Sequence, residues 1–159
     1  MDIFKVSEIL KVAIQIEKNG LAFYNQIKEK AKNFTVAEIF GFLSREEERH
    51  RKIFEQMLEA AGDYQPAESY PGEYELYLEA LAGDNIFKKE VDLRKLASEV
   101  SSDSQAIDLG IGFEKDSIIF YSEMKNFVPK EDCATVERVI AEEKEHLLKL
   151  FSFKKNIKS

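Results

Sequence analysis

Apolar side chains recur at alternating steps of three and four residues in four stretches of this chain. The stretches span about residues 7–31, 35–61, 102–128 and 131–153. Such spacing lines one face of an α-helix with apolar side chains, so each stretch is predicted to form a long helix with one face in a core. Because only short turns separate the members of each pair, we expect two antiparallel helix pairs, at 7–61 and 102–153.

Residue types near the expected helix ends support these boundaries. Residues 35–38 (TVAE) have the spacing of a capping box that opens the second helix, and Gly62 suits a left-handed cap at its end. Residues 102–105 (SDSQ) form a second such box, and the third helix should end before Pro129 because the residue before a proline resists helical conformation. The lysine-rich tail beyond residue 153 is expected to fray.

Six ionisable residues interrupt the apolar seams of these four helices. They are Glu17, Glu47, His50, Glu114, Glu143 and His146. A buried carboxylate without a partner is costly or takes up a proton. Four carboxylates in one core therefore require cations, and a pair of metal ions would supply that charge.

The same residues belong to a pattern that occurs twice. Both histidines of the chain close an E-E-x-x-H string, at 46–50 and 142–146, and each string follows a helix that carries one seam Glu. The offsets between the halves nearly agree, since 114 − 17 = 97 and 143 − 47 = 96. A Glu and a His three residues apart share one helix face, and two copies of Glu plus E-x-x-H are the ligand set of a two-metal site in a helical bundle.

Simpler explanations exist for each of these residues alone. A Glu on a helix is usually a solvated surface residue, and a lone core histidine is more often a structural residue than a ligand. One E-x-x-H string also arises by chance in any Glu-rich helix. The duplication of the pattern in four apolar seams favours the metal site.

The segment 62–101 connects the two helix pairs. Pro66 and Pro71 indicate loop, while 73–81 and 92–100 are predicted to be short helices. If the repeat is a pseudo-twofold, the second and third helices run in the same direction, so the segment must return along the bundle. That is the long crossover of a ferritin-like fold, and we expect a single all-α domain over residues 1–159. A simple up-down-up-down bundle or a coiled coil explains neither the repeat nor the segment.

Composition limits the class of partner and location. A formal charge of −7 and a pI near 5.0 argue against nucleic acid or an anionic membrane surface as a partner. We find neither a run of about 18 apolar residues that would span a membrane nor a signal-peptide layout. The one cysteine, Cys133, cannot form an internal disulfide, which favours a reducing, cytoplasmic setting. It also leaves no paired C-x-x-C strings for a rubredoxin-type domain.

In these motifs the chain resembles rubrerythrins and their ferritin-like relatives, which carry a Glu on the first and third helices and an E-E-x-x-H string on the second and fourth. The likeness covers nearly the whole chain. The chain resembles a stand-alone member of this group that lacks the rubredoxin domain. It implies a di-iron carboxylate centre, with manganese or a mixed pair possible, and the six seam residues as ligands. Glu47 and Glu143 would bridge the metals, while Glu17 and Glu114 would be terminal ligands, one per metal.

One departure from the family pattern concerns ligand exchange. Rubrerythrins usually have a further Glu three residues after the ligand of the third helix, which can exchange with a His as the iron changes oxidation state. This chain has Ser117 there, and Gly20 at the matching place on the first helix, so that switch is not expected. Side chains this small could leave room for the oxidant beside the metals. For Gly20, however, close packing of the helices is the better explanation of the small residue.

The resemblance implies an oxidoreductase that reduces hydrogen peroxide, or dioxygen, with electrons from an external donor such as a rubredoxin. Two alternatives stay open, an iron-binding, ferroxidase or storage protein and a bundle that keeps metal only for stability. A homodimer or higher homo-oligomer is expected.

Two pairs of residues are expected around the metals. Tyr24 and Tyr121, the candidate catalytic residues, each follow a terminal ligand by seven residues and should face the interior. There a phenol could bond a ligand carboxylate or relay a proton or electron, or it could simply be a buried aromatic ring. Glu46 and Glu142 each precede a bridging Glu and should reach the ring nitrogen of the opposite histidine, unless they are plain surface residues.

Overall fold

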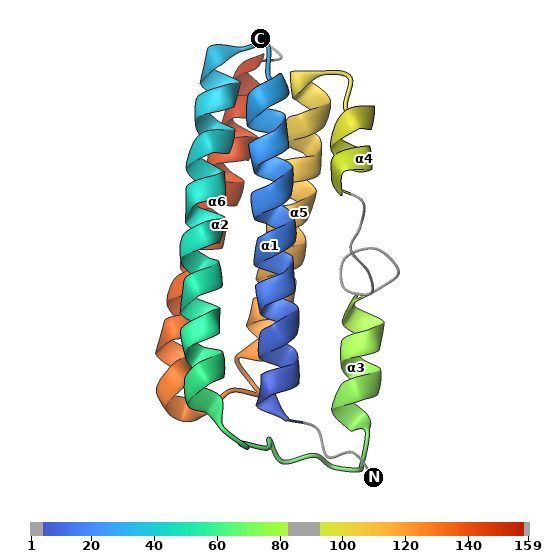
Figure 1. The fold of residues 1–159 in the computed structure, drawn as a ribbon, viewed down its shortest axis with the longest axis vertical. Helices are drawn as coiled ribbons and strands as arrows, with labels where there is room; N and C mark the ends of the chain where they lie inside the picture. The colour runs from blue at the N-terminus through green and yellow to red at the C-terminus, as the bar shows by residue number, and fades with distance from the viewer. Residues whose placement is uncertain (1–4, 83–92, 158–159) are drawn as a thin grey trace.

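The computed structural model describes residues 5–82 and 93–157, which form six helices and no strand. Four helices are long and make up a bundle, namely α1 (Val6–Lys30), α2 (Phe34–Ala61), α5 (Asp103–Met124) and α6 (Lys130–Ile157). Two short helices, α3 (Glu73–Ala82) and α4 (Leu93–Glu99), lie along one side of that bundle (Figure 1). The predicted all-α class is confirmed.

The long helices pack in two antiparallel pairs, α1 with α2 and α5 with α6. Helices α2 and α5 run in the same direction along the bundle (Figure 1), so the chain between them returns from one end of the bundle to the other. This confirms the predicted four-helix bundle with a long crossover. Among the described residues, none of the helices has the length and apolar character needed to cross a membrane.

Two hydrophobic clusters fill the bundle, one towards each end. The first draws on α1 up to Ile16 and on α2 from Phe54, whereas the second draws on α1 from Phe23 and on α2 as far as Leu43. The six ionisable seam residues lie between these two clusters along all four long helices. A polar layer is therefore enclosed by apolar packing on both sides, which removes it from water.

Two predicted helix ends, the start of α2 and the end of α6, were wrong. Helix α2 begins at Phe34, because the side chain of Asn33 accepts hydrogen bonds from the amides of Thr35 and Val36 at 2.8 and 3.3 Å. The capping box predicted at residues 35–38 therefore lies inside the helix. Asn33 is the stronger N-cap, since its short side chain reaches amides that have no partner in the first turn.

The cap of α2 and the end of α6 also differ from the prediction, whereas α2 ends at Ala61 and α5 ends before Pro129, as predicted. Gly62 has a positive φ of 54°, but its ψ of −134° lies outside the left-handed helical region. Helix α5 ends at Met124, five residues before Pro129. Helix α6 continues to Ile157 rather than fraying after residue 153, and Lys154 and Lys155 in its last turn suit the negative end of the helix dipole.

The crossover is attached to the bundle near both ends of α1. The amide of Val6 donates to the carbonyl of Tyr64 at 3.1 Å. At the other end, Lys30 Nζ donates to the carbonyls of Ala97 and Val100 at the end of α4. Asp92, the first residue of the predicted second short helix, and the rest of 83–92 lie outside the described residues.

Candidate metal centre

The six predicted ligands meet in the polar layer, although they come from four helices. Glu17 lies on α1, Glu47 and His50 on α2, Glu114 on α5, and Glu143 and His146 on α6, and each is at most 4% exposed. Their ligand atoms form two overlapping groups, within each of which all atoms lie within 4.8 Å of one another. Glu47 and Glu143 belong to both groups. The layer thus has two halves that share two carboxylates.

Both histidines turn the same ring nitrogen towards the carboxylates. His50 Nδ1 lies 3.2 Å from Glu143 Oε1 and 3.8 Å from Glu17 Oε2. His146 Nδ1 lies 3.0 Å from Glu143 Oε2 and 3.8 Å from Glu114 Oε2. Each half therefore offers one imidazole nitrogen together with carboxylate oxygens, a donor set that suits iron or manganese.

The carboxylates in this layer are short of positive charge. Burial, together with the neighbouring carboxylates, raises the pKa of Glu17 to about 7 and the pKa values of Glu47 and Glu114 well above their usual range. Glu17 Oε2 and Glu47 Oε1 are buried without a hydrogen-bond partner. Buried acceptors that lack a donor are rare in folded proteins, and a cation bound in this layer would satisfy both oxygens.

The remaining charge in the layer is held by the histidines and Glu143. Burial alone would lower the pKa of His50 and His146, but their contacts with the carboxylates raise these pKa values to about 9 and about 10. Burial opposes ionisation of Glu143, yet hydrogen bonds from His146 and His50 lower its pKa. Without metal, two imidazolium groups thus stand in for the cations that four glutamates need, and two divalent ions would supply twice that charge.

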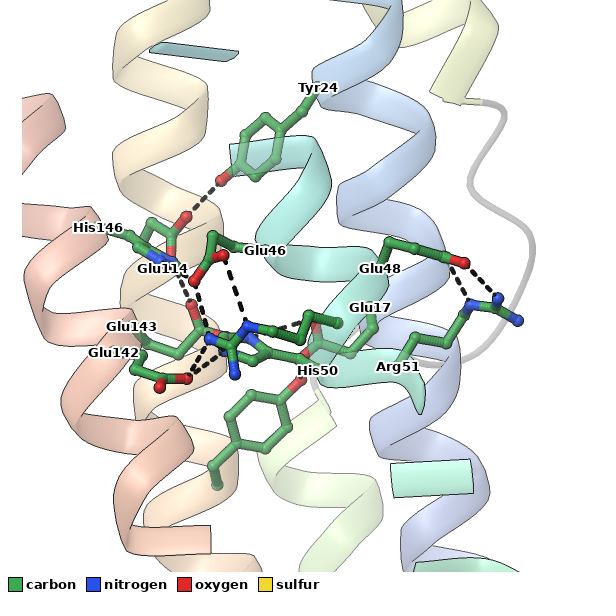
Figure 2. Close-up of polar contacts among 12 residues, drawn as sticks. Glu17, Tyr24, Glu46, Glu48, His50, Arg51, Glu114, Glu142, Glu143 and His146 are labelled. Carbon is green, nitrogen blue, oxygen red and sulfur yellow. Dashed lines mark hydrogen bonds and ion pairs between the residues drawn. The ribbon is translucent and has the colours of Figure 1, made fainter. Parts of the chain in front are cut away.

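An outer ring of ion pairs surrounds the histidines. Glu142 Oε2 lies 2.8 Å from His50 Nε2, and Glu46 Oε2 lies 3.7 Å from His146 Nε2 (Figure 2). The predicted reach of both carboxylates to the opposite histidine is thereby confirmed, closely for Glu142 and more loosely for Glu46. Each histidine has one nitrogen for the inner layer and one for an outer acid, an arrangement that fixes ring orientation and tautomer in metal sites.

Comparison with known proteins identifies the architecture. Residues 8–154 match the family model for rubrerythrin. The chain belongs to the rubrerythrin family. It is also similar, with 30% identity and a TM-score of 0.74, to a candidate ferritin-like diiron-carboxylate protein from Thermotoga maritima, over 98% of this chain and 97% of that one. No curated protein matches the chain significantly. The predicted family and ferritin-like fold are confirmed, and the family together with the buried cluster indicates two metal ions.

The two candidate catalytic tyrosines of this rubrerythrin-family chain each contact a predicted terminal ligand on the other helix pair. Tyr24 Oη on α1 donates to Glu114 Oε1 on α5 at 2.8 Å, and Tyr121 Oη on α5 donates to Glu17 Oε1 on α1. Burial raises the pKa of both phenols well above its usual value, so both stay protonated as donors. The contact with a ligand carboxylate was expected, while a role in proton or electron transfer stays a prediction.

The small residues that depart from the rubrerythrin pattern, Gly20 and Ser117, are both buried. A Cβ atom added at Gly20 would lie 2.6 Å from Glu47 Oε2. The room at Gly20 is therefore taken by the Glu47 carboxylate and is not kept for an oxidant. That Ser117 borders the open side of the metals stays a prediction.

The sequence analysis missed Arg49, which also lies at this site. Its Nη2 donates to Glu46 Oε2 at 2.8 Å and to Glu142 Oε2 at 2.6 Å. A local signal existed, since Arg49 lies between the paired acids and His50 and follows Glu46 by three residues. The contact with Glu142 depends on how α2 packs against α6, which no local pattern specifies.

Proposed function

We propose that this chain is a di-iron oxidoreductase that reduces hydrogen peroxide, with dioxygen as the second candidate oxidant, using electrons from an external donor. The observation that supports the proposal is the two-halved layer of four carboxylates and two imidazoles, enclosed by apolar clusters. A structural layer would be expected to satisfy its own buried acceptors. This one leaves two carboxylate oxygens without donors.

In the proposed centre, Glu17 and Glu114 would each serve one metal, Glu47 and Glu143 would lie between the metals, and the two histidines would complete the set through Nδ1. Two irons held by these residues would supply the two electrons that the oxidant takes up. We propose iron as the native metal, with manganese or a mixed pair as the alternatives.

The surrounding residues would relay protons that come from solvent, and they exclude bulk water. Reduction of hydrogen peroxide to two waters consumes two electrons and two protons. Tyr24 and Tyr121 hold phenolic protons directly on Glu114 and Glu17, and the two hydrophobic clusters keep bulk water from the layer. The electrons would come from an external donor, such as a small redox protein of the rubredoxin type.

Stopped-flow oxidation of the di-ferrous protein tests this function. Protein loaded with two Fe²⁺ per chain under anaerobic conditions is mixed with peroxide or with oxygen, and oxidation is followed by absorbance. Fast oxidation by peroxide that is repeated on addition of reduced rubredoxin supports the proposal. Faster turnover with oxygen would make dioxygen the substrate, iron uptake beyond two per chain would indicate storage, and an inert centre would leave only a structural role.

Two adjacent glutamates on α2 provide a matched control. Glu47→Gln changes a buried member of both metal groups, whereas Glu48→Gln changes a carboxylate that pairs with Arg51 at the surface, at 2.7 Å. We expect Glu47→Gln to lose metal and turnover and Glu48→Gln to keep both. Equal activity of the two variants would contradict the proposed site.

A further inference from the structure

One arginine joins the outer carboxylates of both halves of the site. Arg49 Nη2 is hydrogen-bonded to Glu46 at 2.8 Å and to Glu142 at 2.6 Å, and in each case the oxygen is the one that faces a histidine. These acids come from different helices, α2 and α6. The guanidinium is thus the common partner of two carboxylates, each of which contacts the outer nitrogen of a different histidine.

Two observations show that the bridge from Arg49 to Glu46 and Glu142 is specific to the site. The outer acids approach each other, since ligand atoms of Glu46, His50 and Glu142 lie within 4.8 Å of one another. Two carboxylates this close repel each other unless a cation lies between them. Arg49 also has no counterpart in the sequence repeat, because the residue that corresponds to it at an offset of 96 is Glu145. One arginine therefore serves both halves.

We infer that Arg49 is a positioning residue for the metal centre, which holds Glu46 and Glu142 in place and through them orients both histidines with Nδ1 towards the metals. This inference rests on the proposed two-metal function. Loss of Arg49 would let the two acids separate, and both imidazoles would lose the partner that fixes their rotation. Outer partners of metal-bound histidines commonly change metal affinity by about 10- to 100-fold.

Arg51 offers a matched control two residues further along α2. It pairs with Glu48 at 2.7 Å and with Glu55 at 2.8 Å, and the Arg51–Glu48 pair lies apart from the histidines (Figure 2). Arg49→Gln and Arg51→Gln therefore remove the same charge from the same helix, but only the first change touches the site. Arg49→Lys keeps the charge and tests for rescue.

The experiment measures Co²⁺ binding to the metal-free full chain by competition with a chelator, with the visible spectrum of the bound Co²⁺ as a report on coordination. We expect the wild-type chain to bind two Co²⁺. Arg49→Gln should lose about 10- to 100-fold in Co²⁺ affinity and show altered absorption bands. Arg49→Lys should recover part of that affinity, and Arg51→Gln should behave as wild type. In iron-loaded protein, the midpoint potential should be lower in Arg49→Gln alone, because a nearby cation destabilises the more positive, oxidised centre.

The outcomes separate this inference from the function itself. Wild-type affinity and spectrum in folded Arg49→Gln, or an equal loss in Arg51→Gln, would overturn the role of Arg49. If circular dichroism shows that Arg49→Gln does not fold, Arg49→Lys decides the question. A wild-type affinity and an unchanged spectrum in Arg49→Lys would support the role of the charge. A loss of affinity equal to that of a ligand variant would overturn it. Wild-type protein that binds two Co²⁺ but never turns over peroxide or oxygen would refute the proposed function and leave the inference intact.

Discussion

At the scale of single residues, Gly20 shows how closely the polar layer is packed. The carboxylate of Glu47 occupies the place that a side chain at position 20 would need, with Oε2 2.6 Å and Cδ 3.2 Å from an added Cβ. A carboxylate is the movable end of a flexible side chain, so the chain can fold with an alanine here. The cost would fall on the position of Glu47, which belongs to both metal groups.

We therefore predict that Gly20→Ala separates metal binding from folding. Alanine in place of a helical glycine stabilises a helix by about 0.5–1 kcal/mol, so metal-free Gly20→Ala should unfold no more easily than wild type while its Mn²⁺ affinity falls by about 10-fold or more. Gly112→Ala is the control, because nothing lies within 4 Å of its added Cβ. Urea unfolding and Mn²⁺ titration check both variants, and unchanged Mn²⁺ binding in Gly20→Ala would refute the prediction.

The tyrosines are the second case at this scale. Tyr24→Phe or Tyr121→Phe removes a hydroxyl donor from a buried carboxylate, which should cost the metal-free protein about 1–3 kcal/mol of unfolding free energy. If the phenols also handle protons, the double variant should oxidise more slowly and with an altered metal spectrum. Tyr70→Phe, at a tyrosine that is 55% exposed, is the control. Unchanged rates and spectrum in the double variant would leave the tyrosines only a packing role.

At the scale of the helices, the start of α2 and the start of α5 are linked. Asn33 caps α2 with its side chain, while its own amide donates to Asp103 Oδ2 at 2.9 Å in the first turn of α5. The first turn of α2 is thereby held against the first turn of α5. This position is remote from the polar layer, so it affects stability without touching the candidate ligands.

We predict that Asn33→Ala lowers the unfolding free energy by about 1 kcal/mol, within the range of about 0.5–2 kcal/mol typical of a lost N-cap. Asn33→Asp should retain most of the stability, because a carboxylate accepts the same two amide hydrogen bonds and favours the positive end of the helix dipole. Metal affinity should be unchanged in both variants. Urea unfolding decides the matter, and equal stability of the alanine and aspartate variants would argue against Asn33 as the cap.

At the scale of the whole molecule, the enclosed layer makes the metal-free state sensitive to pH. Glu17 has a folded pKa of about 7, above its ordinary value of 4.5, so the folded state holds that proton more tightly and loses stability as pH rises through this interval. His50 and His146 have folded pKa values of about 9 and about 10. Their contribution is complete below pH 6.5 and is lost as pH rises through those values. The lowered pKa of Glu143 affects stability only below about pH 4.5, outside the pH range in which Glu17 and the histidines titrate.

Metal-free protein should therefore melt at progressively lower temperature as pH rises from about 5 to about 9. Metal ions replace the protons, so the Mn²⁺-loaded protein should gain stability over the metal-free form as pH rises, and loading should release protons. Thermal unfolding across this range, with and without Mn²⁺, measures the difference. A metal-free melting temperature that rises between pH 5 and 9 would be incompatible with the charge arrangement of the layer.

How far the sequence alone determines this molecule depends on the range of each interaction. The four long helices and the two E-E-x-x-H strings follow from periodicity and from spacing of three residues, which are properties of one helix. The offset of 96 to 97 between the halves then places the six predicted ligands at one level of a pseudo-twofold bundle. The long crossover follows from the same repeat, because the second and third long helices must run in the same direction.

Contacts between helices were decided only by the tertiary structure. No local pattern tells which oxygen of Glu142 meets His50, that Arg49 lies between two acids on different helices, or that Glu47 fills the room beside Gly20. These contacts depend on the rotation and axial height at which apolar faces interlock, and side chains across the whole bundle set both. A pattern along the chain records which face of each helix is buried, but it does not record what that face meets.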